Sequence, residues 1–128
     1  MLDTNALIWW TTAPEKLSKK ARNFLEKHIK EEILVSSISI WEVYTLIKKN
    51  KLRFLTNTDI WLESLESLSY VKFAPVDNRI AAQSVKLPDL DEADPADRII
   101  IATAMINGVT LVTSDKKILN YPHVRSIW

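Results

Sequence analysis

Two hydrophobic periodicities alternate along the chain and predict alternating helices and strands. Apolar residues recur at helical spacing from Leu17 to Ile29, and EEILVSS then carries the short β-branched run of a buried strand. By the same reading, further helices are expected at about 40–49, 60–68 and 78–85 and after Asp94, with DKKIL as a short helical turn. Further strands are expected at YVKFAPV and VTLVT, with VRSIW as a possible final edge strand.

The helix after Asp94 has the clearest boundaries. Asp94 is suited to the N-cap, Pro95 to the first helical position, and Gly108 to a left-handed residue at the C-terminal end. The polar segment LPDLDEADPADR before it is expected to be a loop leading into the helix. Its run IIIATAMI is almost wholly apolar, so this helix is expected to be covered on both sides.

Alternating strands and helices favour a parallel sheet covered on both faces. The expected class is α/β, a three-layer α/β/α sandwich with a central parallel sheet. A chain of 128 residues, 47% apolar and 26% charged, fits a single domain over residues 1–128 with a sizeable core.

Composition excludes several kinds of site. There is no cysteine, and the single glycine cannot build a phosphate-binding loop or a dinucleotide-binding GxGxxG. His28 and His123 lie far apart without partners at metal-ligand spacing, so histidine-based zinc sites and a Ser-His-Asp triad have no support. The net charge of +1 means that any nucleic-acid site is local. No stretch is apolar enough to span a membrane, and a cytoplasmic protein is expected.

An acidic residue stands at each of four junctions between a strand pattern and a helix pattern: Asp3, Glu42, Asp97 and Asp115. Each has a purely structural explanation. Asp3 and Asp115 can begin helices, Ser39-x-x-Glu42 has the form of a capping box, and Asp97 suits a first helical turn. Capping does not explain why every junction carries an acid. In one parallel sheet the four carboxylates converge at the carboxyl edge, where such sheets bind ligands.

Clustered carboxylates repel one another, and a bound dication removes that strain. Oxygen ligands without histidine or cysteine favour a hard ion such as Mg²⁺ or Mn²⁺. A carboxylate-held ion of this kind most often hydrolyses phosphate esters, and it needs no nucleophilic side chain. The sequence therefore indicates a metal-dependent enzyme acting on RNA or DNA.

The motifs LDTNALIW, SISIWEV, DPADRIIIATA and LVTSD, in this order, resemble those of the PIN-domain ribonucleases, particularly the VapC-type toxins of toxin–antitoxin pairs. The resemblance covers nearly the whole chain. It implies that Asp3, Glu42, Asp97 and Asp115 are the active-site acids, with Asp3 and Asp97 as the closest metal ligands and Thr113 as an auxiliary residue. It also implies an endoribonuclease dependent on Mg²⁺ or Mn²⁺, cutting structured RNA such as tRNA, held inactive by an antitoxin and forming a homodimer.

The chain departs from this family at its beginning, since only Met1 and Leu2 precede Asp3. Either the first strand is a stub or the sequence begins downstream of its natural start. A non-catalytic PIN-like module that binds RNA or protein is therefore the alternative. Two phosphotransfer folds fit poorly: a haloacid-dehalogenase-like phosphatase needs a second aspartate where Asn5 stands, and a receiver domain needs one within VSSIS.

Basic and aromatic residues leave two further questions open. Lys48, Lys49, Lys51 and Arg53, together with Lys116 and Lys117, form either a solvated surface or a rim that binds phosphates. Trp41 and Trp61 lie in helical patterns and are expected to be buried. Trp9 and Trp10 are adjacent, so one of them is expected to be exposed, at a dimer or antitoxin surface.

Overall fold

The computed structural model describes all residues from Met1 to Trp128 and contains a central parallel sheet. Its strands are β1 (Ile33–Ser36), β2 (Val71–Ala74), β3 (Leu111–Val112) and β4 (Ser126–Ile127). β1 pairs with β2 and β3 with β4, both in parallel. Leu2 bridges the two pairs through Val35 and Val112, again in parallel. The spatial order is therefore β2, β1, Leu2, β3, β4, and the VRSIW segment is confirmed as an edge strand.

The central strand of this sheet is reduced to one residue. Its hydrogen bonds are nevertheless in place: the amide of Leu2 donates to the Leu34 carbonyl at 3.0 Å, and that of Asp3 to the Val112 carbonyl at 3.1 Å. The amide of Val112 in turn donates to the Met1 carbonyl at 2.8 Å. Asp3 is therefore held at the carboxyl end of the central position of the sheet, although only Met1 and Leu2 precede it.

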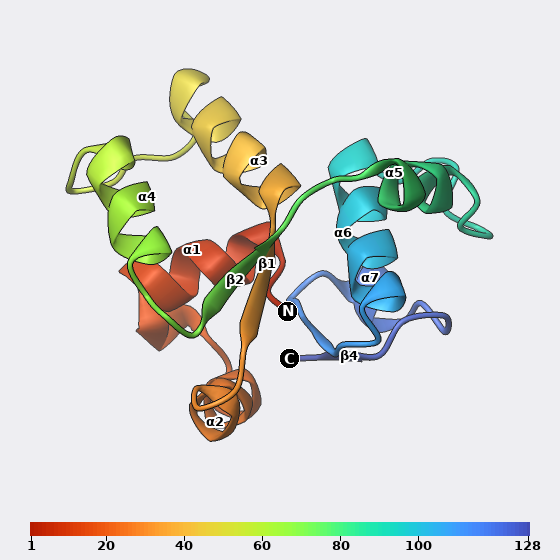
Figure 1. Ribbon diagram of the computed structural model, residues 1–128, viewed down its shortest axis with the longest axis horizontal. Helices are drawn as coiled ribbons and strands as arrows, with labels where there is room; N and C mark the ends of the chain where they lie inside the picture. Colours follow the sequence, from red (N-terminus) through yellow and green to blue (C-terminus); the bar gives the residue numbers. More distant parts are fainter.

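Helices cover both faces of the sheet (Figure 1). They are α1 (Thr4–Thr12), α2 (Lys19–His28), α3 (Ser37–Lys48), α4 (Thr58–Glu66), α5 (Asn78–Val85), α6 (Pro95–Ile106) and α7 (Lys116–Leu119). A single 3-10 turn, Pro14–Lys16, follows α1. Figure 1 shows α1, α2, α3 and α4 gathered around β1 and β2, with α5, α6 and α7 on the other side of the molecule.

Two separate cores confirm the three layers. Val35 and Val112 belong to the core shared with α1 and α4, whereas their strand neighbours Leu34 and Leu111 face the core of α6 and α7. Adjacent residues of a strand point to opposite faces, so each strand supplies both cores. In α6, Ile100 and Ile101 are 1% and 0% exposed, as its apolar run predicted.

Local signals determine most element boundaries. The Asp94 carboxylate accepts the Ala96 amide at 2.9 Å, Pro95 begins α6, and Gly108 has a φ of +63°, all as expected. The α3 helix begins at Ser37, three residues before the predicted start, because Ser36 already occupies the N-cap position. No helix in the structure is both long and apolar enough to cross a membrane.

The tryptophans differ from the expectation at one position. Trp61 is buried at 7% exposure, as predicted, but Trp41 is 61% exposed, so the prediction that it is buried is wrong. The reason lies in the orientation of α3, which turns Ser39 and Val43 toward the interior. Trp9 and Trp10 are both half-buried, and their rings pack on Trp128 and Tyr70.

Candidate active site

Asp3 occupies the N-cap position of α1 and is only 5% exposed. One carboxylate oxygen, Oδ1, accepts the Ala6 amide at 2.6 Å. Burial raises the pKa of this carboxyl, and the negative charge of Asp115 raises it further, whereas a hydrogen bond from Thr113 lowers it. The structural explanation of Asp3 as a cap is therefore confirmed, and the same carboxylate interacts electrostatically with a second acid.

Glu42 does not form the capping box that the sequence suggested. Because α3 begins at Ser37, Ser39 lies inside the helix, and its buried hydroxyl has no hydrogen-bond partner. The Glu42 carboxylate instead accepts the Thr4 hydroxyl at 2.5 Å, across 38 positions of sequence. Burial raises the pKa of Glu42, the Thr4 hydrogen bond lowers it, and the charges of Asp94 and Asp3 raise it.

Asp97 lies in the first turn of α6 and has the most strongly perturbed environment of the site. Burial, followed by the negative charges of Glu42, Asp115, Asp94 and Asp3, raises its pKa to about 6. None of these causes is a hydrogen bond that would stabilise the charged form. The ionised Asp97 side chain therefore lacks a cationic or hydrogen-bonding partner that matches its charge.

Asp115 is joined to Asp3 through Thr113. Asp115 is the N-cap of α7, where its Oδ1 accepts the Lys117 amide at 2.7 Å. Thr113 is fully buried, and its hydroxyl oxygen accepts the Asp115 amide at 3.0 Å. The same side chain lowers the pKa of Asp3, so Thr113 links the Asp3 carboxylate to the backbone of Asp115.

The fold thus brings all four predicted acids into one electrostatic neighbourhood, together with Asp94. In this arrangement no three of them lie close enough to hold one metal ion. Their chemistry nevertheless fits a hard divalent cation, because every donor is a carboxylate oxygen and burial disfavours their unpaired charges. A cation at this edge would remove that disfavoured charge.

Sequence reasoning missed Thr4, which orients Glu42. The hydroxyl residue directly after the first acid is visible in the LDTN motif, but its partner lies on another helix. The sequence makes Asp94 a weaker candidate for the site than the four acids, because its position as an N-cap explains it. The structure adds an electrostatic role, since its charge raises the pKa of both Glu42 and Asp97.

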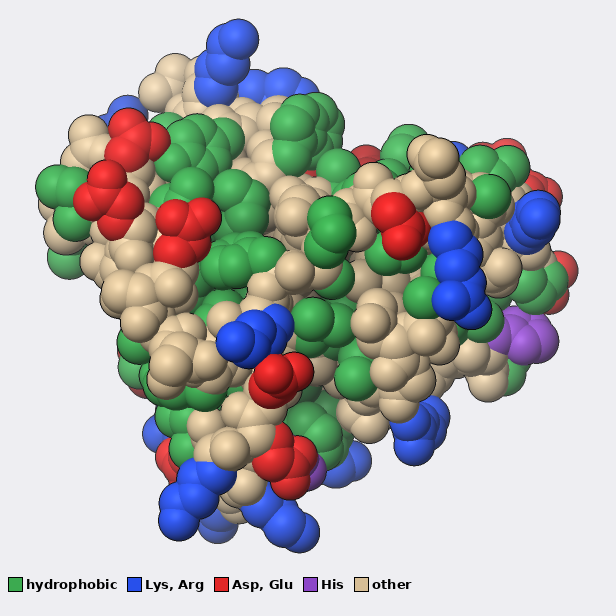
Figure 2. Space-filling model, in the orientation of Figure 1, with side chains coloured by type: hydrophobic (Ala, Val, Ile, Leu, Met, Phe, Trp, Pro, Cys, Tyr) green, Lys and Arg blue, Asp and Glu red, His purple; other side chains and the backbone are tan.

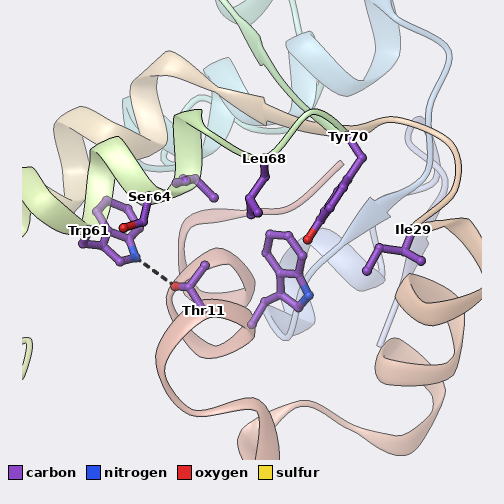
Figure 3. Close-up of a pocket in the computed structure, with 8 residues that line it drawn as sticks. Thr11, Ile29, Trp61, Ser64, Leu68 and Tyr70 are labelled. Carbon is purple, nitrogen blue, oxygen red and sulfur yellow. Dashed lines mark hydrogen bonds between the residues drawn. The ribbon is translucent and has the colours of Figure 1, made fainter.

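A second, mostly apolar cavity lies away from the acidic edge. It has a volume of about 400 Å³ and contains none of the site acids. Figure 3 shows Thr11 of α1, Trp61 and Ser64 of α4, and Leu68 and Tyr70 beyond it, with the bond from Trp61 to Thr11 dashed. The acids of the candidate site therefore lie outside this apolar cavity.

The fold and the acidic edge together define a PIN domain. The sequence matches the PIN-domain family over residues 1–124, and the chain belongs to that family. It is 32% identical to Ribonuclease VapC22 of Mycobacterium tuberculosis over 127 residues, covering 99% of this chain and 95% of that protein.

Solved structures show the same fold. VapBC2 from Rickettsia felis, bound to a promoter DNA fragment, matches with a TM-score of 0.72 and 22% identity, covering 100% of this chain and 97% of that one. FitAcB from Neisseria gonorrhoeae matches with a TM-score of 0.68 and 22% identity, covering 99% and 95% of the two chains. The predicted fold class is thereby confirmed.

Proposed function

We propose that this chain is a metal-dependent endoribonuclease that hydrolyses RNA phosphodiester bonds and is the toxin of a type II toxin–antitoxin pair. The observation that carries the proposal is the set of four mutually interacting carboxylates, Asp3, Glu42, Asp97 and Asp115, at the carboxyl edge of a parallel sheet. Near full-length similarity to a protein named as a ribonuclease supports the reaction class.

The side chains have distinct roles in this proposal. Asp3 and Asp97 are the closest ligands of Mg²⁺ or Mn²⁺, and Glu42 and Asp115 complete the site directly or through water. When bound, the ion activates water for attack on the phosphorus and neutralises charge on the leaving oxygen. Thr4 holds the Glu42 carboxylate and Thr113 holds that of Asp3, so both acids are oriented before substrate arrives.

Substrate and partners follow from the same family. Structured RNA such as tRNA is the proposed substrate, and the cytoplasm is the proposed location. The solved neighbours include complexes described as VapBC and as a toxin–antitoxin complex, which supports an antitoxin as the inhibitory partner. A homodimer is the proposed assembly of the toxin itself.

Cleavage of a total tRNA pool tests the proposal. We expect wild-type protein to cut with Mn²⁺, to stop with EDTA, and to recover when Mn²⁺ is restored. Asp97→Asn should lower the rate by roughly 10²–10³-fold, a typical loss for one charge-stabilising group. Asp91→Asn is the matched control, since this exposed acid lies in the loop before α6 and should leave the rate unchanged. Cleavage that survives both EDTA and Asp97→Asn would refute the proposal.

One observation favours the alternative, a non-catalytic PIN-like module that binds RNA or protein: no three of the acids lie close enough to hold one ion. Titration calorimetry with Mn²⁺ separates the two functions. Heat of binding that Asp97→Asn abolishes supports the enzyme. Absence of binding by the wild-type chain supports the module.

A further inference from the structure

A groove beside the acidic edge is lined by residues of α3 and of the start of α6. Its volume is about 350 Å³, and Glu42 and Asp94 form part of its wall. Figure 2 shows a notch in the upper edge of the molecule, between α3 and the α5–α6 pair of Figure 1. Since Glu42 belongs both to the groove and to the proposed active site, a molecule in the groove lies directly beside the reacting bond.

Trp41 gives this groove an aromatic wall. It precedes Glu42 on α3, lines the groove and remains 61% exposed. None of the aromatic ring pairs in the structure includes Trp41. A large indole surface left in water has no part in the core, but it offers a flat face on which an unpaired base can stack.

Two lysines stand at the far end of the groove, Lys49 and Lys51. The chain reverses there: Asn50 has a φ of +55°, and the Lys51 amide donates back to the Leu46 carbonyl at 2.9 Å. This Schellman-type ending fixes the backbone of Lys51 against α3, and it keeps Lys49 and Lys51 close enough for both to line the groove. Figure 2 shows basic side chains at the top of the view, where α3 ends in Figure 1.

The spacing of these groups matches a short stretch of polynucleotide. Seven residues separate Glu42 from Lys49 on α3, which corresponds to about 10 Å along the helix axis. At roughly 3.4 Å or more per nucleotide, this spans at most about three nucleotides. With a net charge of only +1 the whole molecule hardly attracts a polyanion, so a local pair of lysines has a disproportionate effect.

A second copy of the chain is a less suitable occupant. It would have to bury the carboxylates of Glu42 and Asp94 together with both lysine ammonium groups, and desolvation of so many charges opposes association. Cores of protein interfaces are correspondingly depleted in lysine and glutamate. Phosphates, in contrast, bring a charge opposite to that of the two lysines, and a base covers the exposed indole.

We propose that this groove binds a single-stranded segment of the RNA substrate next to the scissile bond, with a base stacked on Trp41 and phosphates held by Lys49 and Lys51. The proposal rests on the proposed ribonuclease function, and it specifies which part of the surface recognises the substrate. The strand recognised is unpaired, because a base within a duplex has no free face for the indole.

Binding is measured with a fluorescein-labelled, mixed-sequence 12-nucleotide RNA by anisotropy, in an Asp97→Asn background that prevents cleavage. Trp41→Ala should raise Kd by about 5- to 100-fold, and Trp41→Phe should restore most of the affinity because it keeps a stacking ring. Leu55→Ala removes a fully exposed apolar side chain outside the groove and should leave Kd unchanged.

The lysines are tested through salt dependence. Replacing both Lys49 and Lys51 by alanine should reduce the slope of log K against log salt by about 1.4, since each single-strand phosphate contact contributes roughly 0.7. The matched control replaces Lys30 and Lys86, two exposed lysines outside the groove, with the same change in net charge. An equal reduction in both double variants would mean that only net charge matters and would overturn the proposal.

Three further outcomes decide between this proposal, an interface between copies of the chain, and failure of the nuclease function. If Trp41→Ala leaves Kd unchanged but converts a dimer to a monomer in sedimentation, the groove is an interface between copies and the proposal is wrong. If RNA binding depends on Trp41 while the wild-type chain cuts no RNA with Mn²⁺, the groove binds RNA as proposed but the proposed nuclease function is wrong. Failure of the parent chain to bind the oligonucleotide at low salt overturns the groove itself.

Discussion

The two ends of α1 border two very different regions. Its N-terminal end carries Asp3 and joins the acidic edge, whereas its C-terminal end carries Trp10 and Thr11 in the wall of the apolar cavity. The nine residues of α1 span only about 13 Å. One short helix therefore separates a region of disfavoured charge from a region of apolar packing.

The two regions differ in whether their polar groups have hydrogen-bonding or charged partners. In the apolar cavity the Trp61 indole N–H donates to the Thr11 hydroxyl at 3.1 Å, and that hydroxyl donates to the Leu7 carbonyl at 2.9 Å. At the acidic edge, burial and neighbouring carboxylates raise the pKa of Asp97 to about 6. A hydrogen-bonded polar group stabilises the fold. A partly buried charge without a partner lowers stability, and such charges are typical of ligand-binding and catalytic sites.

The largest effect on stability is expected at the apolar end. Trp61 is 7% exposed and its ring lies 5.0 Å from that of Phe54, so Trp61→Ala should reduce the free energy of unfolding by about 3–5 kcal/mol. Urea denaturation measures this as a lower midpoint with an unchanged m-value. Trp41→Ala makes the same replacement at an exposed site and should change stability by less than about 0.5 kcal/mol.

Trp61→Phe keeps the comparison measurable if the alanine variant fails to fold. It retains a ring against Phe54 but loses the indole hydrogen bond to Thr11, so a loss of about 1 kcal/mol is expected. Its cleavage rate should equal that of the wild type, because none of the acids lies in that cavity. A fall in rate at unchanged folding would show that the two ends of α1 are coupled.

The next largest effect is expected at the acidic end, on addition of metal. Mn²⁺ at about 100 times its Kd should stabilise the wild-type chain by roughly 2.7 kcal/mol, a rise in Tm of roughly 10 °C for a domain of this size. Asp97→Asn should show no rise, yet its metal-free Tm should exceed that of the wild type because a disfavoured charge is gone. Asp91→Asn should behave as the wild type. An equal rise in Tm with Mn²⁺ in Asp97→Asn would show that Asp97 is not a metal ligand.

Sequence patterns predicted the local features of both regions and missed the features that depend on tertiary packing. The caps at Asp3, Asp94 and Asp115 depend on adjacent residues, so they could be predicted. The bond between Thr4 and Glu42 could not, because it joins two helices.

The exposure of Trp41 was missed for a related reason. An apolar residue at helical spacing does not reveal which face of the helix other elements will cover. Here the covered face of α3 carries Ser39 and Val43, and the indole remains outside it. The predicted capping box from Ser39 to Glu42 is wrong because α3 begins at Ser37, which places Ser39 inside the helix.

The smallest expected effect is the pH dependence of the metal-free chain. Burial and neighbouring charges raise the folded-state pKa of Asp97 from 3.8 to about 6, and they raise those of Asp3 and Glu42 in the same direction. A carboxyl whose pKa is raised by folding contributes stability that is complete below the unfolded pKa and lost as pH rises through the folded value. In EDTA the acidic edge should therefore favour the folded state more at pH 5 than at pH 7, by up to about 2 kcal/mol. Burial lowers the pKa of the Met1 amino group to about 6, and this group acts in the opposite direction over the same range. Thermal melts of three chains at both pH values check this: relative to the wild type, Asp97→Asn should lose stability at pH 5 compared with pH 7, whereas Trp61→Phe should keep the wild-type difference, since it leaves every titrating group in place. Equal differences in the two variants would mean that the pH dependence arises outside the acidic edge.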